Sequence, residues 1–125
     1  MFKFTWVTLR VSDIDKSLTF YRDILGMPMS EDASHDAMQI AMMGTDNGPR
    51  IELLSKGSEV IDNPGQGVTY GLSVENVDEL AYKLMVAGVP VRGPYSPTPG
   101  FKFYFTQDPD GYTIQLVGKK LDEDE

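Results

Sequence analysis

The feature that most constrains this 125-residue chain is that its two halves resemble each other at a fixed offset of 63 residues. Identical residues recur at this offset, among them Leu9 and Leu72, Val11 and Val74, Asp15 and Asp78, Gly48 and Gly111, Ile51 and Ile114, and Leu53 and Leu116. A repeat of this size predicts two copies of one supersecondary unit, because one copy alone cannot bury its apolar face. Such copies commonly pack about a pseudo-twofold axis, which makes their junction the natural place for a ligand.

The first half predicts a strand, a helix and three further strands. Apolar and polar residues alternate over residues 4–11, the period of two that is typical of a strand with two different faces. Ser12 and Asp13 offer a helix N-cap, and Gly26 offers a helix end that tolerates a positive φ. The three shorter strands are predicted at residues 28–30, 37–43 and 50–55.

The second half predicts the same elements in the same order. A strand over residues 69–74 precedes a helix that begins with the capping box of Asn76 and Glu79 and ends at Gly88. The remaining strands are predicted at residues 89–92, 101–106 and 112–117, and a proline-containing loop over residues 93–100 is expected to border the site.

These elements predict one α+β domain, residues 1–125, that consists of two βαβββ modules. The first module covers residues 4–55 and the second covers residues 69–118. A polar linker, residues 56–68, joins them, and an acidic tail, residues 119–125, follows. Each module has a helix on one face of its sheet, so the opposite, open face is where a ligand is expected.

The composition excludes several classes of protein. The chain has no cysteine, which excludes disulfides, thiolate nucleophiles and cysteine metal sites. Its net charge of −8, to which the last four residues contribute, argues against nucleic-acid binding and favours a neutral or cationic ligand. No apolar run approaches the roughly 20 residues of a membrane span, and the first residues lack the pattern of a signal peptide. We therefore expect a cytoplasmic protein with neither nucleic-acid nor membrane partners.

Three segments carry a resemblance to a known family. The sequence LRVSDIDKSLTFYRDILGM near the start, IELL in the middle and DPDGYTIQLV near the end resemble the vicinal oxygen chelate superfamily, which includes glyoxalase I, bleomycin-resistance proteins and extradiol dioxygenases. The resemblance covers roughly residues 4–118. It implies a pair of βαβββ modules that form an incomplete, cup-shaped barrel. It also implies a homodimer with small-molecule sites where modules pair.

The resemblance to glyoxalase I implies four positions for a divalent metal. One lies on the first strand of each module, here Trp6 and Thr69, and one lies on the last strand of each module, here Glu52 and Gln115. The family pattern has histidine at the first two positions and carboxylates at the other two, so only Glu52 fits. An indole nitrogen is only a donor, and Thr69 and Gln115 carry no charge. Because a catalytic ion needs about three protein ligands, we expect no metal or other cofactor.

On the first strand, alternation places Trp6, Thr8 and Arg10 on the open face. The indole of Trp6 is either a stacking wall for a planar or cationic ligand or a plug for the vacated cavity. Glu52 is a general base, a ligand counter-ion or the ion-pair partner of Arg10. The helix side of this strand is expected to carry Val7, Leu9 and Val11.

In the second module, Thr69 and Gln115 either orient a polar ligand by hydrogen bonds or form hydrogen bonds with one another. Lys102 and Tyr104 are expected on the ligand side of their strand, with the core on the other side formed by Phe101, Phe103 and Phe105. The only histidine, His35, is either a surface residue or an acid/base group on a loop that folds over the site.

The favoured hypothesis is a metal-independent protein that binds a small aromatic or cationic ligand in clefts of a homodimer. Its expected ligand contacts are Trp6, Thr8, Arg10, Glu52, Thr69, Lys102, Tyr104 and Gln115. The alternative is a lyase or isomerase of the glyoxalase type, with Glu52 as its catalytic residue and a non-standard metal site, for example Glu52 with His35. A structural or regulatory dimer with filled clefts is a third possibility.

Overall fold

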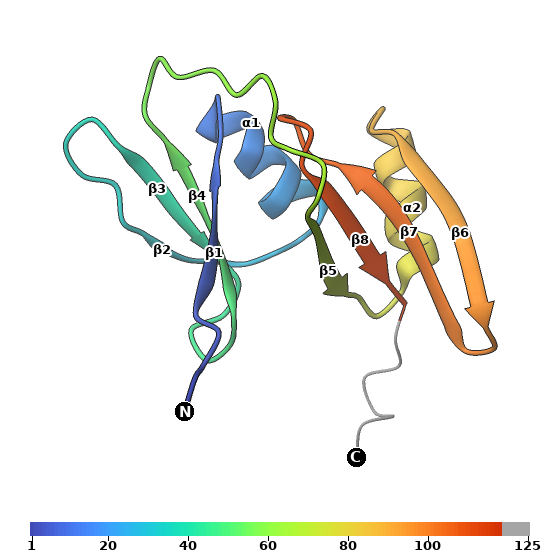
Figure 1. The fold of residues 1–125 in the computed structure, drawn as a ribbon. Helices are drawn as coiled ribbons and strands as arrows, with labels where there is room; N and C mark the ends of the chain where they lie inside the picture. The colour runs from blue at the N-terminus through green and yellow to red at the C-terminus, as the bar shows by residue number, and fades with distance from the viewer. Residues whose placement is uncertain (119–125) are drawn as a thin grey trace. The chain divides into compact units, whose positions relative to one another are not determined.

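The computed structural model describes residues 1–118, and the acidic tail proposed from the sequence, residues 119–125, lies outside them. The chain divides into two compact units, Met1–Asn63 and the part that begins at Pro64. Each unit contains one four-stranded sheet and a helical segment between its first and second strands, as the coloured ribbon in Figure 1 shows.

The first unit follows the predicted order of elements. Strand β1 is followed by the short helix α1, which continues as a wider π-helical segment η1, and then by three strands. Their bounds are β1 Trp6–Arg10, α1 Ile14–Leu18, η1 Thr19–Ile24, β2 Met29–Asp32, β3 Gln39–Met43 and β4 Arg50–Ser55. The strands lie in the order β1-β4-β3-β2, and only the pair β1 and β4 is parallel.

The second unit repeats this arrangement. Its elements are β5 Thr69–Ser73, α2 Val77–Val86, β6 Val91–Thr98, β7 Phe101–Gln107 and β8 Thr113–Val117. The strands lie in the order β5-β8-β7-β6, again with the first and last strands parallel. The α+β class and the two βαβββ modules predicted from the sequence are therefore confirmed.

The strand register shows how closely the two sheets correspond. Thr8 lies opposite Glu52 in the first sheet, and Gly71 lies opposite Gln115 in the second, each residue 63 positions after its counterpart (71 − 8 and 115 − 52). Equivalent positions on the two sheets therefore face the same way relative to the helix of their own unit.

The helices begin where the capping residues predict. The Asp13 carboxylate accepts from the backbone N–H groups of Asp15 and Lys16, at 3.0 and 3.2 Å. In the second unit, the Asn76 side chain accepts from the N–H of Glu79 at 3.1 Å. These bonds satisfy donors that a helix N-terminus otherwise leaves without a partner.

One face of each sheet is buried against helical segments. Leu9 and Val11, predicted to point toward the helices, are 1% and 0% exposed, while Val7 is half-buried. In the second unit, Leu84 of α2 and Leu116 of β8 are also completely buried. The hydrophobic core of each unit therefore forms on its helix side, which leaves the other face of the sheet for a different use.

The predicted loop over residues 93–100 is mostly a strand. β6 extends to Thr98 and pairs with β7 in an interrupted register, in which Tyr95 lies opposite Phe103. The prolines that favoured a loop, Pro94 and Pro97, are tolerated because β6 is the outer strand of its sheet and needs fewer backbone donors. Figure 1 shows β6 in orange beside β7.

The predicted faces of β7 are wrong. The Tyr104 hydroxyl donates to Asp78 of helix α2 at 2.7 Å, and the Lys102 ammonium donates to the other oxygen of this carboxylate at 2.9 Å. Tyr104 is buried, so both residues lie on the helix side and do not face the open side. The three phenylalanines of β7, expected in the core, instead lie on the open face and are partly exposed: Phe101, Phe103 and Phe105.

Asp78 couples helix α2 to its sheet in a way that depends on pH. Hydrogen bonds from Lys102 and Tyr104 hold the pKa of Asp78 below its ordinary value, and the bond to Asp78 raises the pKa of Tyr104 to about 12. Because the folded pKa of Asp78 is lowered, its stabilisation is present above the ordinary value of about 3.9 and is lost as the pH falls through the folded value.

We predict that Asp78→Asn lowers the free energy of unfolding by about 1 kcal/mol at pH 7, because two partly exposed hydrogen bonds are weakened. Urea denaturation between pH 7 and pH 3 should show this difference shrinking below about pH 4. Glu79→Gln is the matched control, since Glu79 carries the same charge in the same first turn of α2. An equal loss in both variants would contradict a specific role of Asp78.

Candidate functional site

The open face of the first sheet carries the four first-unit residues predicted to bind a ligand. Trp6, Thr8 and Arg10 lie on one side of β1, and Glu52 lies opposite Thr8 on β4. The Thr8 hydroxyl donates to a Glu52 carboxylate oxygen at 2.5 Å. Trp6 is 47% exposed. The structure therefore brings these four side chains to one face of one sheet.

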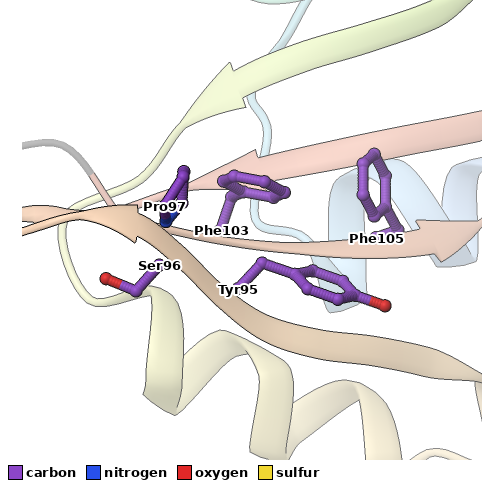
Figure 2. Close-up of a pocket in the computed structure, with 5 residues that line it drawn as sticks. All are labelled: Tyr95, Ser96, Pro97, Phe103 and Phe105. Atoms are coloured by element: carbon purple, nitrogen blue, oxygen red, sulfur yellow. The ribbon is translucent and has the colours of Figure 1, made fainter.

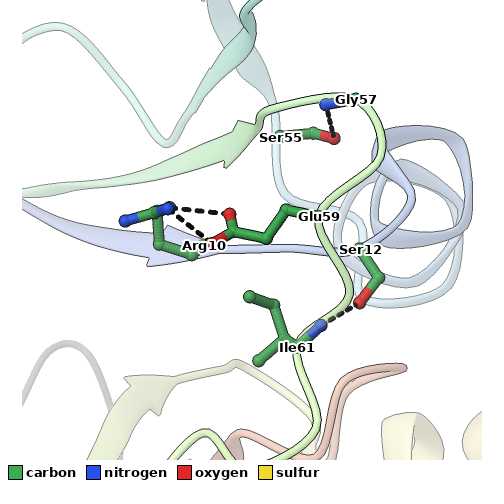
Figure 3. A network of polar contacts seen from close by, with 6 residues as sticks. All are labelled: Arg10, Ser12, Ser55, Gly57, Glu59 and Ile61. Carbon is green, nitrogen blue, oxygen red and sulfur yellow. Dashed lines mark hydrogen bonds and ion pairs between the residues drawn. The ribbon is translucent and has the colours of Figure 1, made fainter.

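The ion pair between Arg10 and Glu52, one of the three roles considered for Glu52, does not form. Arg10 instead donates two hydrogen bonds to Glu59, at 3.0 and 2.6 Å (Figure 3). Two-point contacts of this kind are the strong form of an arginine–carboxylate bond. Glu59 belongs to the predicted linker and is 49 residues away from Arg10 in the sequence. No sequence pattern predicts a contact between residues so far apart.

Figure 3 shows that other bonds hold this segment of the linker to the first unit. The Ser12 hydroxyl accepts from the backbone N–H of Ile61 at 2.8 Å, and the Ser55 hydroxyl accepts from the N–H of Gly57 at 3.4 Å. The Ser12 hydroxyl, which the sequence suggested as a helix cap, thus binds the linker, and Asp13 is the N-cap residue of α1. The first part of the linker is therefore an ordered extension of the first unit.

The residues at the four metal positions do not fit a divalent ion. Trp6 and Glu52 lie on the same face of the first sheet, and Thr69 and Gln115 lie on the corresponding face of the second. Of these, only Glu52 supplies a charged oxygen ligand, and one of its oxygens already accepts from Thr8. Within residues 1–118, no three or more histidine, aspartate and glutamate side chains are grouped to hold a metal ion. The donor set lacks the charge and the number of ligands that a catalytic site requires.

The open face of the second sheet is aromatic. Tyr95 of β6 lies 5.6 Å from Phe103 and 5.9 Å from Phe105, measured between ring centroids, and Phe101 lies 5.3 Å from Phe103. These separations fall in the range of favourable contacts between aromatic rings. Four rings thus form one surface on neighbouring strands.

Three of these rings, those of Tyr95, Phe103 and Phe105, border an open hollow of about 430 Å³. Figure 2 shows the residues that line the hollow, all of which belong to the hairpin of β6 and β7. They are Tyr95, Ser96, Pro97, Phe103 and Phe105. The volume lies within the range of about 300–1,000 Å³ that is typical of small-molecule pockets. Alternation in the sequence did not identify the two phenylalanines as lining residues, because β7 has large residues on both faces. The segment expected to border a site, residues 93–100, supplies the other three.

Arg92 and Gln115 lie next to the hollow. The guanidinium carbon of Arg92 is 5.0 Å from the centroid of Phe105, a cation–π distance, and Gln115 lies opposite Phe105 in the sheet. Thr69 is exposed at the start of β5, and within residues 1–118 its side chain forms no hydrogen bond with Gln115. The alternative in which these two side chains satisfy one another is therefore not what the structure shows.

His35 lies on the surface of the first unit. Its side chain is exposed, and its Nδ1 atom is 3.1 Å from the carbonyl oxygen of Ala33 in the same turn. This position agrees with the interpretation of His35 as a surface residue. Across residues 1–118, no helix combines the length and the apolar character needed to cross a membrane.

Comparisons with known proteins agree with this architecture. A profile described as the Glyoxalase/Bleomycin resistance protein/Dioxygenase superfamily matches residues 3–116. The lactoylglutathione lyase of Escherichia coli O157:H7 is 31% identical over 122 residues, which cover 90% of this chain and 89% of that protein.

Solved structures give the same result. Glyoxalase I of Leishmania major, described as trypanothione-dependent, has a TM-score of 0.82 and 26% identity over 95% of this chain and 88% of its own. TnmS3, described as an antibiotic binding protein from Streptomyces sp. CB03234, has a TM-score of 0.70 over 93% of this chain and 94% of its own. At a sequence identity of 24%, this similarity establishes a shared fold and nothing about a shared function. From its repeat, its strand register and its sequence match, the chain belongs to the glyoxalase/bleomycin resistance protein/dioxygenase superfamily, as the resemblance to vicinal oxygen chelate proteins predicted.

Proposed function

We propose that this chain is a metal-independent binding protein that holds a small, flat aromatic molecule against the open face of its second sheet. The observation that carries the proposal is the hollow of about 430 Å³ between Tyr95, Phe103 and Phe105. A flat ligand that enters it stacks on rings that are already held in place by their neighbours. Favourable ring contacts contribute about 0.5–1.5 kcal/mol each, in addition to the burial of apolar surface.

The partial exposure of these rings supports a binding role. Phe101 is 38% exposed and Tyr95 is 42% exposed, although both lie within strands of the sheet. Aromatic side chains that stay exposed on a folded domain do not gain the favourable free energy of apolar burial unless a ligand or partner covers them. The helix side of the same sheet, in contrast, is fully packed, as the complete burial of Ile114 and Leu116 shows.

The proposal that no metal takes part rests on the chemistry of the donors. Three of the four positions that hold a metal in glyoxalase I carry indole, hydroxyl and amide groups here: Trp6, Thr69 and Gln115. None of these supplies a negative charge, and the indole supplies no lone pair for a metal. The remaining carboxylate, Glu52, is one ligand where about three are needed.

A second candidate is a lyase of the glyoxalase type, favoured by the 31% identity with the E. coli lactoylglutathione lyase. Glu52 is then its catalytic residue, because it keeps a carboxylate at a family position and its orientation is fixed by Thr8. Such an enzyme needs further metal ligands from outside the four positions. This requirement makes it the weaker of the two candidates.

We predict that Phe103→Ala weakens the binding of naphthalene-2-carboxamide, a flat neutral probe, by about tenfold, because it removes one ring from the wall of the hollow. Isothermal titration calorimetry measures the dissociation constant. Tyr82→Ala is the matched control, since Tyr82 is an aromatic residue on α2 that is 69% exposed and does not line the hollow. Equal affinity of Phe103→Ala and the unaltered protein contradicts the proposed site.

We also predict that protein purified without chelator contains far less than one zinc, nickel, iron or manganese ion per chain. Elemental analysis and native mass spectrometry measure this ratio. With added Zn²⁺ or Ni²⁺, an assay for lactoylglutathione lyase activity should stay at background. The lyase candidate replaces our proposal if a stoichiometric metal is found and is lost in Glu52→Gln but kept in Glu75→Gln, a control that removes an equal charge from the second unit.

A further inference from the structure

The strands of the second sheet contain no acidic residue. Their sequences, TYGLS, VRGPYSPT, FKFYFTQ and TIQLV, include two charged side chains, Arg92 and Lys102, both of them cationic. Lys102 points to the helix side, where Asp78 neutralises it. Arg92 is therefore the charged strand residue that remains on the open face of this sheet.

The position of Arg92 directs its charge toward the hollow. Arg92 lies opposite Phe105 in the strand pairing, and its guanidinium is 5.0 Å from the centre of the Phe105 ring. Phe105 is also part of the wall of the hollow. The stacking contact keeps the guanidinium beside the hollow, although the side chain is exposed and has many other rotamers available.

Within residues 1–118, no carboxylate forms an ion pair with Arg92. The flat guanidinium has five N–H donors at its edge, and stacking on a ring uses its face and not its edge. Its hydrogen-bonding edge is therefore available to a ligand that lies against Phe105.

We infer that Arg92 determines the ligand class of this hollow, so that flat aromatic molecules bearing a carboxylate bind in preference to neutral and cationic molecules of the same shape. This inference rests on the proposed function, since it requires that the hollow binds aromatic molecules at all. The ring of the ligand stacks against Phe103 and Phe105, and its carboxylate accepts from the guanidinium of Arg92.

The same geometry disfavours the cationic ligand that the net charge of the chain suggested. That net charge is a property of the whole sequence, whereas the strands around the hollow carry no acid. A cationic ligand finds no counter-ion there and meets the like charge of Arg92. A charge-assisted bond at this partly exposed site is expected to change the dissociation constant about five- to tenfold.

The test compares three probes of equal shape: naphthalene-2-carboxylate, naphthalene-2-carboxamide and naphthalen-2-ylmethylammonium. Isothermal titration calorimetry at pH 7.5 and low salt measures each dissociation constant with the full-length protein. We expect the carboxylate to bind about five- to tenfold more tightly than the amide, and the ammonium to bind most weakly. Raising the salt concentration should reduce the preference, because it screens an exposed charge.

Three variants assign the preference to Arg92. Arg92→Gln should remove the preference for the carboxylate while the amide still binds, and Arg92→Lys should keep part of it, because the charge remains but the planar fork is lost. Arg22→Gln makes the same substitution on η1 of the first unit and should leave all three affinities unchanged.

The outcomes separate this inference from the proposed function. If the three probes bind with equal affinity, if the ammonium binds most tightly, or if Arg92→Gln keeps the preference, the role of Arg92 is wrong and the aromatic site stands. If none of the probes binds, the proposed function is wrong and the inference fails with it.

Discussion

The side chains that this molecule exposes on its two sheets follow from the parallel pairing of the first and last strands in each unit. A parallel pair cannot be closed by a tight turn, so the chain must cross over one face of the sheet, and here it does so through a helix. The helix buries that face and leaves the other one uncovered. The register then decides which side chains the uncovered face carries, because a slip of one residue would exchange the two faces completely.

The two open faces have diverged in chemistry while the framework has stayed the same. The first carries polar and charged groups that bond to one another, as Thr8 does with Glu52 and Arg10 with Glu59. The second carries a continuous aromatic surface that includes Tyr95 and Phe103. Because function depends on such local groups and not on the framework, the family assignment alone does not determine what the chain does.

The sequence was sufficient to predict the framework. The 63-residue repeat predicted two equivalent modules, and capping residues such as Asn76 placed the start of a helix to the residue. These features depend on short-range geometry and on the alternation of apolar residues, both of which are visible in a single chain.

The site was harder to predict for three physical reasons. Strand β7 has large residues on both faces, so alternation did not show that Tyr104 is buried and Phe103 is not. Prolines predicted a loop where the outer position of β6 permits a strand. The bond between Arg10 and Glu59 joins residues far apart in the chain, and only the folded backbone brings them together. The expected homodimer and the contribution of each residue to binding remain predictions.

The prolines of β6 have a consequence for solubility. An outer strand with unpaired backbone amide groups can pair with a strand of another molecule, which leads to aggregation. Neighbouring aromatic side chains make this pairing more favourable. Pro94 and Pro97 lack these amide groups, and the irregular pairing of β6 with β7 bends the strand away from a flat template. The protein can therefore keep aromatic side chains exposed at its surface while its outer strand offers other chains fewer backbone groups to pair with.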